Sequence, residues 1–208
     1  MPTLKQIRIV GKPIVFVAAS LPLAWLAAGL AGIGGADLGV DPIETLQDEL
    51  GEWGLRFLLI TLAITPLQKI VGKPWPLLFR RMLGLFAYTY CALHFANYLV
   101  LDQGLYLPEI LEDIFERPFI TVGFAALLLM TPLAVTSTYG WQRRLGNRWK
   151  TLHRLIYPIA ILACWHFWWQ VKKDLTEPLI YAGILAVLLG FRLWRQRRTL
   201  QRTAAAQS

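Results

Sequence analysis

The sequence has little charge and almost no cysteine. Only 16% of its 208 residues are charged and 56% are hydrophobic, whereas roughly a quarter of an ordinary soluble domain is charged. The two cysteines, Cys91 and Cys164, both lie inside apolar runs, which argues against a disulfide framework or a thiolate zinc site. With a mean hydropathy of +0.46, the composition predicts an integral membrane protein.

Six apolar segments are long enough to cross a bilayer, which takes about 20 helical residues, with a range of about 17 to 25. The second segment is the weakest, because Arg56 and Gln68 shorten its apolar centre. The sequence therefore predicts an all-α, polytopic membrane helix bundle with no soluble domain, no persuasive internal repeat and a frayed tail over 195–208. The predicted spans are residues 14–33, 54–70, 82–101, 118–137, 153–171 and 178–194.

Acidic and basic residues are concentrated in different connections between these spans. All 13 acidic residues fall in the segments 37–52, 102–116 and 174–177, and 17 of the 21 basic residues fall in the other connections and at the two ends. Because basic loops stay in the cytoplasm, six spans with both termini cytoplasmic satisfy every loop. The net charge of +8 then reflects insertion and attraction to anionic membrane lipid, and we expect no nucleic-acid partner.

No acidic residue lies inside a predicted span. This absence argues against a proton pump, against most transporter mechanisms and against a carboxylate-bound metal. The sequence also lacks a GxGxxG motif, a P-loop and any indication of a Ser-His-Asp arrangement. We predict no catalytic side chain, so any chemistry has to come from a cofactor.

Two of the three histidines lie at matched depth. His94 follows Arg81 by 13 residues and His166 follows Arg154 by 12, in two spans predicted to run in the same direction. Both imidazoles therefore lie roughly 18 to 20 Å from the cytoplasmic entry. One imidazole from each helix is what axial coordination of a haem iron needs. The alternative is that both are polar residues packing helices together, and the matched depth favours the haem site.

His153 has no such partner. It lies about 20 Å from His166 along the helix, and the residues at its depth in the third span are Arg80 and Arg81. It is a candidate ligand for a second, inner haem, or else an interfacial histidine in a basic loop.

The cytoplasmic loops combine basic and aromatic residues. This composition is typical of cytoplasmic anchoring, and it also fits docking of a flavin or of an acidic flavoprotein donor. The residues predicted for that docking site are Arg80, Arg81, Arg144, Arg148, Trp149 and Lys150.

Several blocks of sequence resemble the ferric-reductase-like transmembrane family, and within it the haem-binding membrane subunits of bacterial periplasmic methionine sulfoxide reductase systems. The similarity covers nearly the whole chain, and the blocks around the histidines are the most specific. The blocks are ITPLQKI (64–70), RRMLGLFAYTYCALHF (80–95), RPFITVG (117–123), TSTYGWQRRLGNRWKTLHRLIYPIAILACWHF (136–167) and PLIYAG (178–183).

The resemblance implies a single transmembrane domain over residues 1–208, in the bacterial inner membrane, with haem b and FMN. Electrons would pass from a cytoplasmic flavin reductase or the quinone pool to a periplasmic molybdopterin-containing enzyme that repairs oxidised methionine in envelope proteins. By motif, His94 and His166 match the haem ligands and His153 the third family histidine. Two-haem relatives carry a histidine where this chain has Arg80 and Arg81, so one haem is expected and two are left open.

Two alternatives remain. One is a stand-alone transmembrane reductase of ferric iron or oxygen, and the other is a cofactor-free membrane scaffold with structural histidines. The acidic segments 41–52 and 109–116 are predicted docking surfaces for the molybdenum subunit, although exclusion from the cytoplasm explains their charge equally well.

Overall fold

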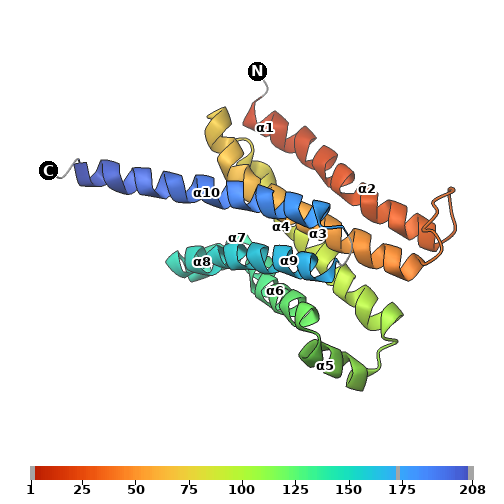
Figure 1. The fold of residues 1–208 in the computed structure, drawn as a ribbon. Helices are drawn as coiled ribbons and strands as arrows, with labels where there is room; N and C mark the ends of the chain where they lie inside the picture. The colour runs from red at the N-terminus through yellow and green to blue at the C-terminus, as the bar shows by residue number, and fades with distance from the viewer. Residues whose placement is uncertain (1–2, 172–173, 206–208) are drawn as a thin grey trace.

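Every regular element of the described chain is a helix. The computed structural model describes residues 3–171 and 174–205, and within them the helices pack into an elongated bundle from which the C-terminal helix projects (Figure 1). The predicted all-α class is confirmed.

The first helical segment comprises α1 (Leu4–Gln6), η1 (Ile7–Gly11) and α2 (Lys12–Leu30). It begins earlier than the predicted span, because Thr3 caps the helix with its hydroxyl on the Gln6 amide. It ends at Leu30, since the following glycines at 32, 34 and 35 all have positive φ, a conformation that glycine adopts without strain.

The acidic segment 41–52 is helical, and therefore α3 (Pro42–Val71) starts well before the predicted span at residue 54. The Asp41 carboxylate accepts hydrogen bonds from the Ile43 and Glu44 amides, at 3.1 Å each, and Pro42 follows at the first helical position. Gly72 ends the helix at φ +69°.

The middle of the chain forms α4 (Leu77–Asn97), η2 (Tyr98–Asp102), α5 (Leu107–Glu116) and α6 (Pro118–Val135). The short α5 adds a helix to a connection predicted only as acidic. The rest comprises α7 (Tyr139–Leu145), α8 (Asn147–Leu152), η3 (His153–Leu155), α9 (Ile156–Gln170) and α10 (Thr176–Ala205). The predicted frayed tail is wrong as far as Ala205, because α10 continues to that residue; residues 206–208 lie outside the described part.

Four helices are long and apolar enough to cross a membrane: Leu4–Leu30, Pro42–Val71, Pro118–Val135 and Thr176–Thr199. The two remaining predicted spans contain α4 and α9, which carry His94 and His166. The first turn of α4 contains Arg80 and is followed by Arg81, and α9 has only 15 residues after the 3₁₀ turn η3. Six spans and cytoplasmic termini therefore stay predictions.

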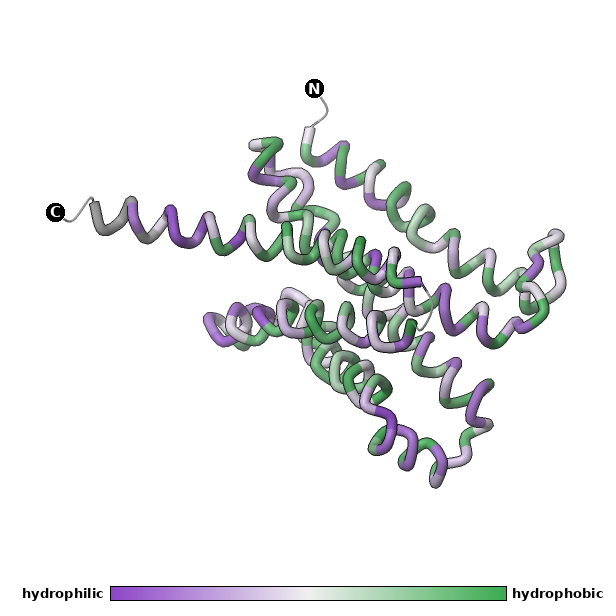
Figure 2. The backbone as a smooth tube through the Cα atoms, viewed as in Figure 1, coloured by the Kyte–Doolittle hydropathy of each residue, from purple (hydrophilic) through white to green (hydrophobic). Residues whose placement is uncertain are grey.

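Hydrophobic residues predominate along the middle of the helices, whereas hydrophilic residues gather at helix ends and along the end of α10 (Figure 2). On α2, Ile14, Val17 and Leu21 each keep about 60% of their surface exposed. Apolar side chains exposed over a whole helix face fit contact with lipid rather than with water.

Tyr90 fastens α4 to α2. Its side chain is fully buried, and its hydroxyl accepts a hydrogen bond from the Leu23 amide at 3.0 Å and donates one to the Ala19 carbonyl at 2.9 Å. A regular helix joins these two backbone groups to each other. Tyr90 therefore bridges the backbone of α2 just where Pro22 interrupts its hydrogen bonding.

We expect Tyr90→Phe to loosen α2. The change leaves a buried amide and a buried carbonyl without the bridging hydroxyl, which costs about 1–3 kcal/mol. Hydrogen–deuterium exchange should be faster for amides of α2 around residues 19–25. Tyr88→Phe is the matched control, because no hydrogen bond of its hydroxyl occurs within the described residues; equal acceleration in both variants would contradict the bridging role.

Candidate cofactor site between two histidines

The structure brings His94 of α4 and His166 of α9 together. Their ring centroids are 6.1 Å apart and the ring planes are nearly perpendicular, at 82°. Each of these helices packs on a second one: α4 on α3 and α9 on α6. These two pairs make the most extensive helix–helix contacts of the described chain.

Each imidazole is held by a backbone carbonyl. His94 Nδ1 lies 2.8 Å from the Gln47 carbonyl oxygen, and His166 Nδ1 lies 2.7 Å from that of Phe119. Because a carbonyl oxygen only accepts hydrogen bonds, Nδ1 carries the proton in both rings. The lone pair is therefore on Nε2 of each ring, which is the arrangement that metal-binding histidines adopt.

The two histidine environments are built alike. The carbonyl acceptor precedes its histidine by 47 residues in both cases, and a glycine one turn later faces the same ring. A Cβ added at Gly51 would lie 3.0 Å from His94 Nδ1, and one at Gly123 would lie 2.8 Å from His166 Nδ1. The α3–α4 and α6–α9 helix pairs therefore hold their histidines in the same way, while the absence of a persuasive repeat in the sequence stays a prediction.

A cavity of about 600 Å³ includes both imidazoles in its lining. Apolar side chains line most of its inner part, and Ala163 leaves space beside His166. No group of three or more His, Cys, Asp or Glu side chains able to hold a metal occurs among the described residues. The apolar lining consists mainly of Leu55, Leu58, Phe95, Phe124, Leu127 and Met130.

Two amides lie beside His94. The Gln47 side-chain nitrogen is 3.3 Å from His94 Nε2, and Asn97 Nδ2 donates to Gln47 Oε1 at 2.7 Å. Asn97 is 6% exposed, and its Oδ1 is buried without a hydrogen-bond partner. Leaving such an oxygen unpaired is costly, so this wall of the cavity is suited to a ligand with a hydrogen-bond donor or an ordered water.

The outer rim of the cavity is acidic. Several carboxylates from the first turns of α3 line it, and Glu52 forms an ion pair with Arg56. Arg56 Nε donates to the Tyr181 hydroxyl at 2.8 Å, which ties α3 to α10. Arg117 supplies positive charge to the same rim. The acidic lining residues are Asp41, Glu44, Asp48, Glu52 and Asp102.

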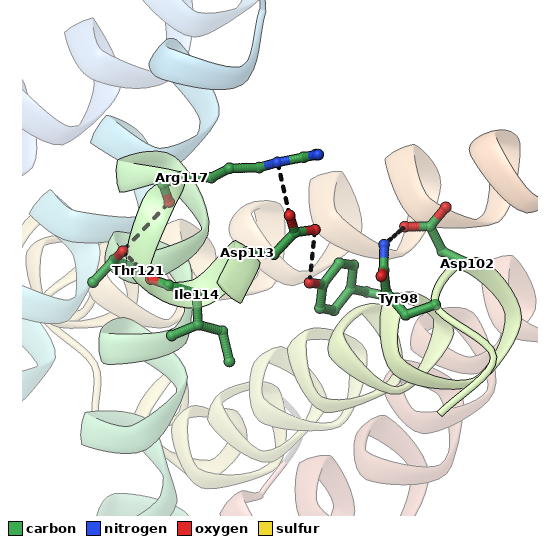
Figure 3. Close-up of polar contacts among 7 residues, drawn as sticks. Tyr98, Asp102, Asp113, Ile114, Arg117 and Thr121 are labelled. Carbon is green, nitrogen blue, oxygen red and sulfur yellow. Dashed lines mark hydrogen bonds and ion pairs between the residues drawn. The ribbon is translucent and has the colours of Figure 1, made fainter. Parts of the chain in front are cut away.

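Polar contacts fix α5 beside this rim (Figure 3). The Tyr98 hydroxyl donates to Asp113 at 3.2 Å, and Arg117 Nε pairs with the same carboxylate at 2.9 Å. The Thr121 hydroxyl donates to the Ile114 carbonyl, which joins α5 to α6. Asn97 and Tyr98, which follow His94 in the chain, line the cavity, whereas Tyr90 bonds the backbone of α2.

His153 lies apart from the other two histidines. Its ring stacks on Trp149 with centroids 4.0 Å apart, and its Nε2 is 3.1 Å from the Thr136 hydroxyl. That hydroxyl donates to the Pro132 carbonyl at 2.6 Å, so Nε2 acts as the donor to Thr136. In this arrangement the His153 Nε2 lone pair is not free for a metal.

The predicted flavin-docking residues do not converge on the histidine cavity. Arg81 lies over the Tyr139 ring at 5.8 Å, and Arg144 lies over Trp141 at 5.6 Å. Trp149 donates to the Thr136 carbonyl at 2.9 Å. Arg148 and Lys150 are exposed on α8, and Arg80 is half-buried on α4. None of the six lines the cavity.

Sequence reasoning missed the residues that support the imidazoles. Gln47 contacts the His94 ring, Gly51 faces the same ring and Gly123 faces the ring of His166. The sequence signal that could have found them is a glycine that precedes each histidine by the same number of residues. This signal is weak, because the sequences of the α3–α4 and α6–α9 helix pairs have few identical residues in common.

The fold and the facing imidazoles define a class: a multi-pass helical membrane protein with a histidine-lined cavity between its helices. The family described as ferric reductase like transmembrane component matches residues 50–164. No solved structure matches the chain.

Two relatives have the same printed name, protein-methionine-sulfoxide reductase heme-binding subunit MsrQ. The protein from Xanthomonas euvesicatoria pv. vesicatoria is 52% identical over 203 residues, which are 96% of this chain and 93% of the relative. The protein from Rhodospirillum rubrum is 54% identical over 184 residues, 88% and 87% of the two chains. The chain belongs to the ferric reductase-like transmembrane family, in the group of the MsrQ proteins.

We expect Gly123→Ala to destabilise the protein. Alanine favours a helix over glycine by about 0.5–1 kcal/mol, but overpacking costs about 1–3 kcal/mol. The ring of His166 cannot move away without losing its bond to Phe119. Gly84→Ala is the control, because its Cβ would make only an ordinary 3.5 Å contact with Thr61. Thermal unfolding in detergent should show a lower midpoint for Gly123→Ala alone.

Proposed function

We propose that this chain is a haem-binding electron-transfer subunit of a methionine sulfoxide reductase system in the bacterial inner membrane. The observation that carries the proposal is the pair of facing imidazoles, each with Nδ1 on a backbone carbonyl and Nε2 left for iron. The names of the MsrQ relatives support the same cofactor and the same system.

The site residues fit a haem. Metal–imidazole bonds of about 2 Å put two nitrogens on one ion about 4 Å apart and their ring centroids about 6 Å apart, and the observed distance is 6.1 Å. The cavity of about 600 Å³ is within the usual range of cofactor sites, about 300–1,000 Å³. With two imidazoles and no third ligand in the described residues, the other ligands have to belong to the cofactor, as they do in a porphyrin.

A bound haem would supply one-electron chemistry at its iron. The chain's own residues would do the rest. The Gln47 and Phe119 carbonyls orient the two rings and keep Nε2 unprotonated, and the lining leucines and phenylalanines exclude water. The Gln47 amide, now 3.3 Å from His94 Nε2, would have to give up that contact when the imidazole binds iron.

We further propose six spans with both termini in the cytoplasm, single-domain organisation over 1–208, and a periplasmic acceptor that contains molybdopterin. The acidic rim of α3 and the neighbouring α5 would attract a basic surface of that acceptor. Haem b, FMN, and a flavin reductase or the quinone pool as donor follow from the family resemblance. A second haem at His153 is the alternative, and its contacts with Trp149 and Thr136 favour a structural role instead.

The haem proposal predicts an absorption spectrum. Purified protein should show a Soret band and a sharp α band on reduction. His94→Ala and His166→Ala should each lose most of the haem, because one of the two imidazoles that would hold the iron is removed. His153→Ala is the matched control and should keep its haem. A colourless wild-type protein would favour the cofactor-free scaffold, and loss of half the haem in His153→Ala would favour two haems.

The acceptor proposal predicts which oxidant the reduced protein uses. Reduced protein should be reoxidised rapidly when the molybdenum reductase and methionine sulfoxide are both added, and only slowly by ferric chelates or oxygen. Stopped-flow absorbance of the α band measures the rates. Rapid reoxidation by ferric iron or oxygen without the partner would favour the stand-alone reductase.

A further inference from the structure

A second cavity lies far from the imidazoles, between α3, α9 and α10. We name it the α3–α10 groove; its volume is about 350 Å³. It is basic toward one end, where Lys69, Arg192 and Arg195 lie, and apolar toward the other, where Leu62, Leu188 and Leu189 lie.

The two ends follow from the helix directions. Leu62 precedes Lys69 on α3 by the same number of residues as Leu188 precedes Arg195 on α10, and the two helices run in the same direction past each other (Figure 1). Seven residues span about 10 Å of helix. The groove therefore changes from apolar to basic over about the same distance that separates the acyl chains of a lipid from its headgroup.

No Asp or Glu among the described residues lines the basic end of the groove. Residues 53–101 and 117–173 contain no Asp or Glu, and neither does any residue after Glu177. Half-buried Arg80 of α4 feels the like charge of Arg192, and Arg192 lies over the Tyr157 ring at 4.5 Å. Lys69 and Arg192 are exposed and Arg195 is half-buried, and an anion bound among such clustered cations offsets their mutual repulsion.

The groove's position selects the kind of anion. In the proposed topology, on which this step rests, Lys69 and Arg195 lie at the cytoplasmic surface of the membrane, and Leu62 and Leu188 lie within its inner leaflet. Basic pockets between helices at that depth hold anionic headgroups. A free phosphate would use the cations but not the apolar end.

We propose that the α3–α10 groove binds an anionic phospholipid of the cytoplasmic leaflet. Lys69, Arg192 and Arg195 hold its phosphate, and Leu62, Leu188 and Leu189 contact one acyl chain. The lipid joins α10 to α3 and α9 at the cytoplasmic end, as the Arg56–Tyr181 hydrogen bond joins α10 to α3 at the other end.

Native mass spectrometry of the purified full-length protein tests the site with added phosphatidylglycerol. We expect the wild type to retain it at concentrations where phosphatidylcholine is lost. Arg195→Gln should weaken retention roughly fivefold, the usual effect of one basic residue at a membrane surface. Arg197→Gln is the control, because Arg197 is exposed on the same helix and does not line the groove.

Three results would overturn the proposal. Equal loss in Arg195→Gln and Arg197→Gln would mean unspecific charge attraction. Equal retention of phosphatidylcholine would mean that the cations do not select the lipid. Displacement by millimolar inorganic phosphate or FMN would mean a phosphate site rather than a lipid site.

Two further variants distinguish misfolding, loss of the lipid site and loss of the haem site. If Arg195→Gln does not fold, Lys69→Gln replaces it, with Lys5→Gln on α1 as its control. His94→Ala should keep the lipid while losing the haem. A chain that binds lipid but no haem would contradict the proposed function alone, and one that binds haem but no lipid would contradict the groove alone.

Discussion

The hydrogen bonds from two buried imidazoles to backbone carbonyls are the constraint on which the site depends. Each bond fixes the tautomer of one histidine, turns its Nε2 toward the cavity and offsets part of the cost of placing a polar ring among apolar side chains. Both acceptors lie on helices other than those of the histidines, so the bonds also fix how α3 packs on α4 and α6 on α9. Gly51 and Gly123 are required at these positions because a side chain there would displace the ring.

The surroundings of the two imidazoles are alike in geometry but not in polarity. On the His94 side, Gln47 and Asn97 form a polar wall with one unpaired buried oxygen. On the His166 side, the equivalent of Gln47 is Phe119, whose ring stacks on the imidazole with centroids 6.4 Å apart. A metal held between the two rings would therefore meet one ligand in a polar environment and one in an apolar environment. Such differences around axial ligands tune a redox potential.

Charge is separated along the bundle. The carboxylates gather around the outer rim of the histidine cavity, and the cations that they could have neutralised lie at the opposite end, around the α3–α10 groove. This separation fits the proposed orientation in the membrane, and each end would attract a partner of opposite charge. For the outer end we propose a soluble protein and for the inner end a lipid.

The sequence alone determined the all-α class and the apolar character of the helices, and it predicted that His94 and His166 form a pair, because hydropathy, loop charge and helical rise depend only on local sequence. Only the tertiary structure decided that Gln47 and Phe119 hold those rings, that Asn97 lies beside them and that His153 bonds Thr136. It also revealed the shared arrangement of carbonyl and glycine around the two imidazoles and the early start of α3. These features depend on which backbone groups meet across helices that are 47 residues apart in the chain, and local patterns do not record such contacts.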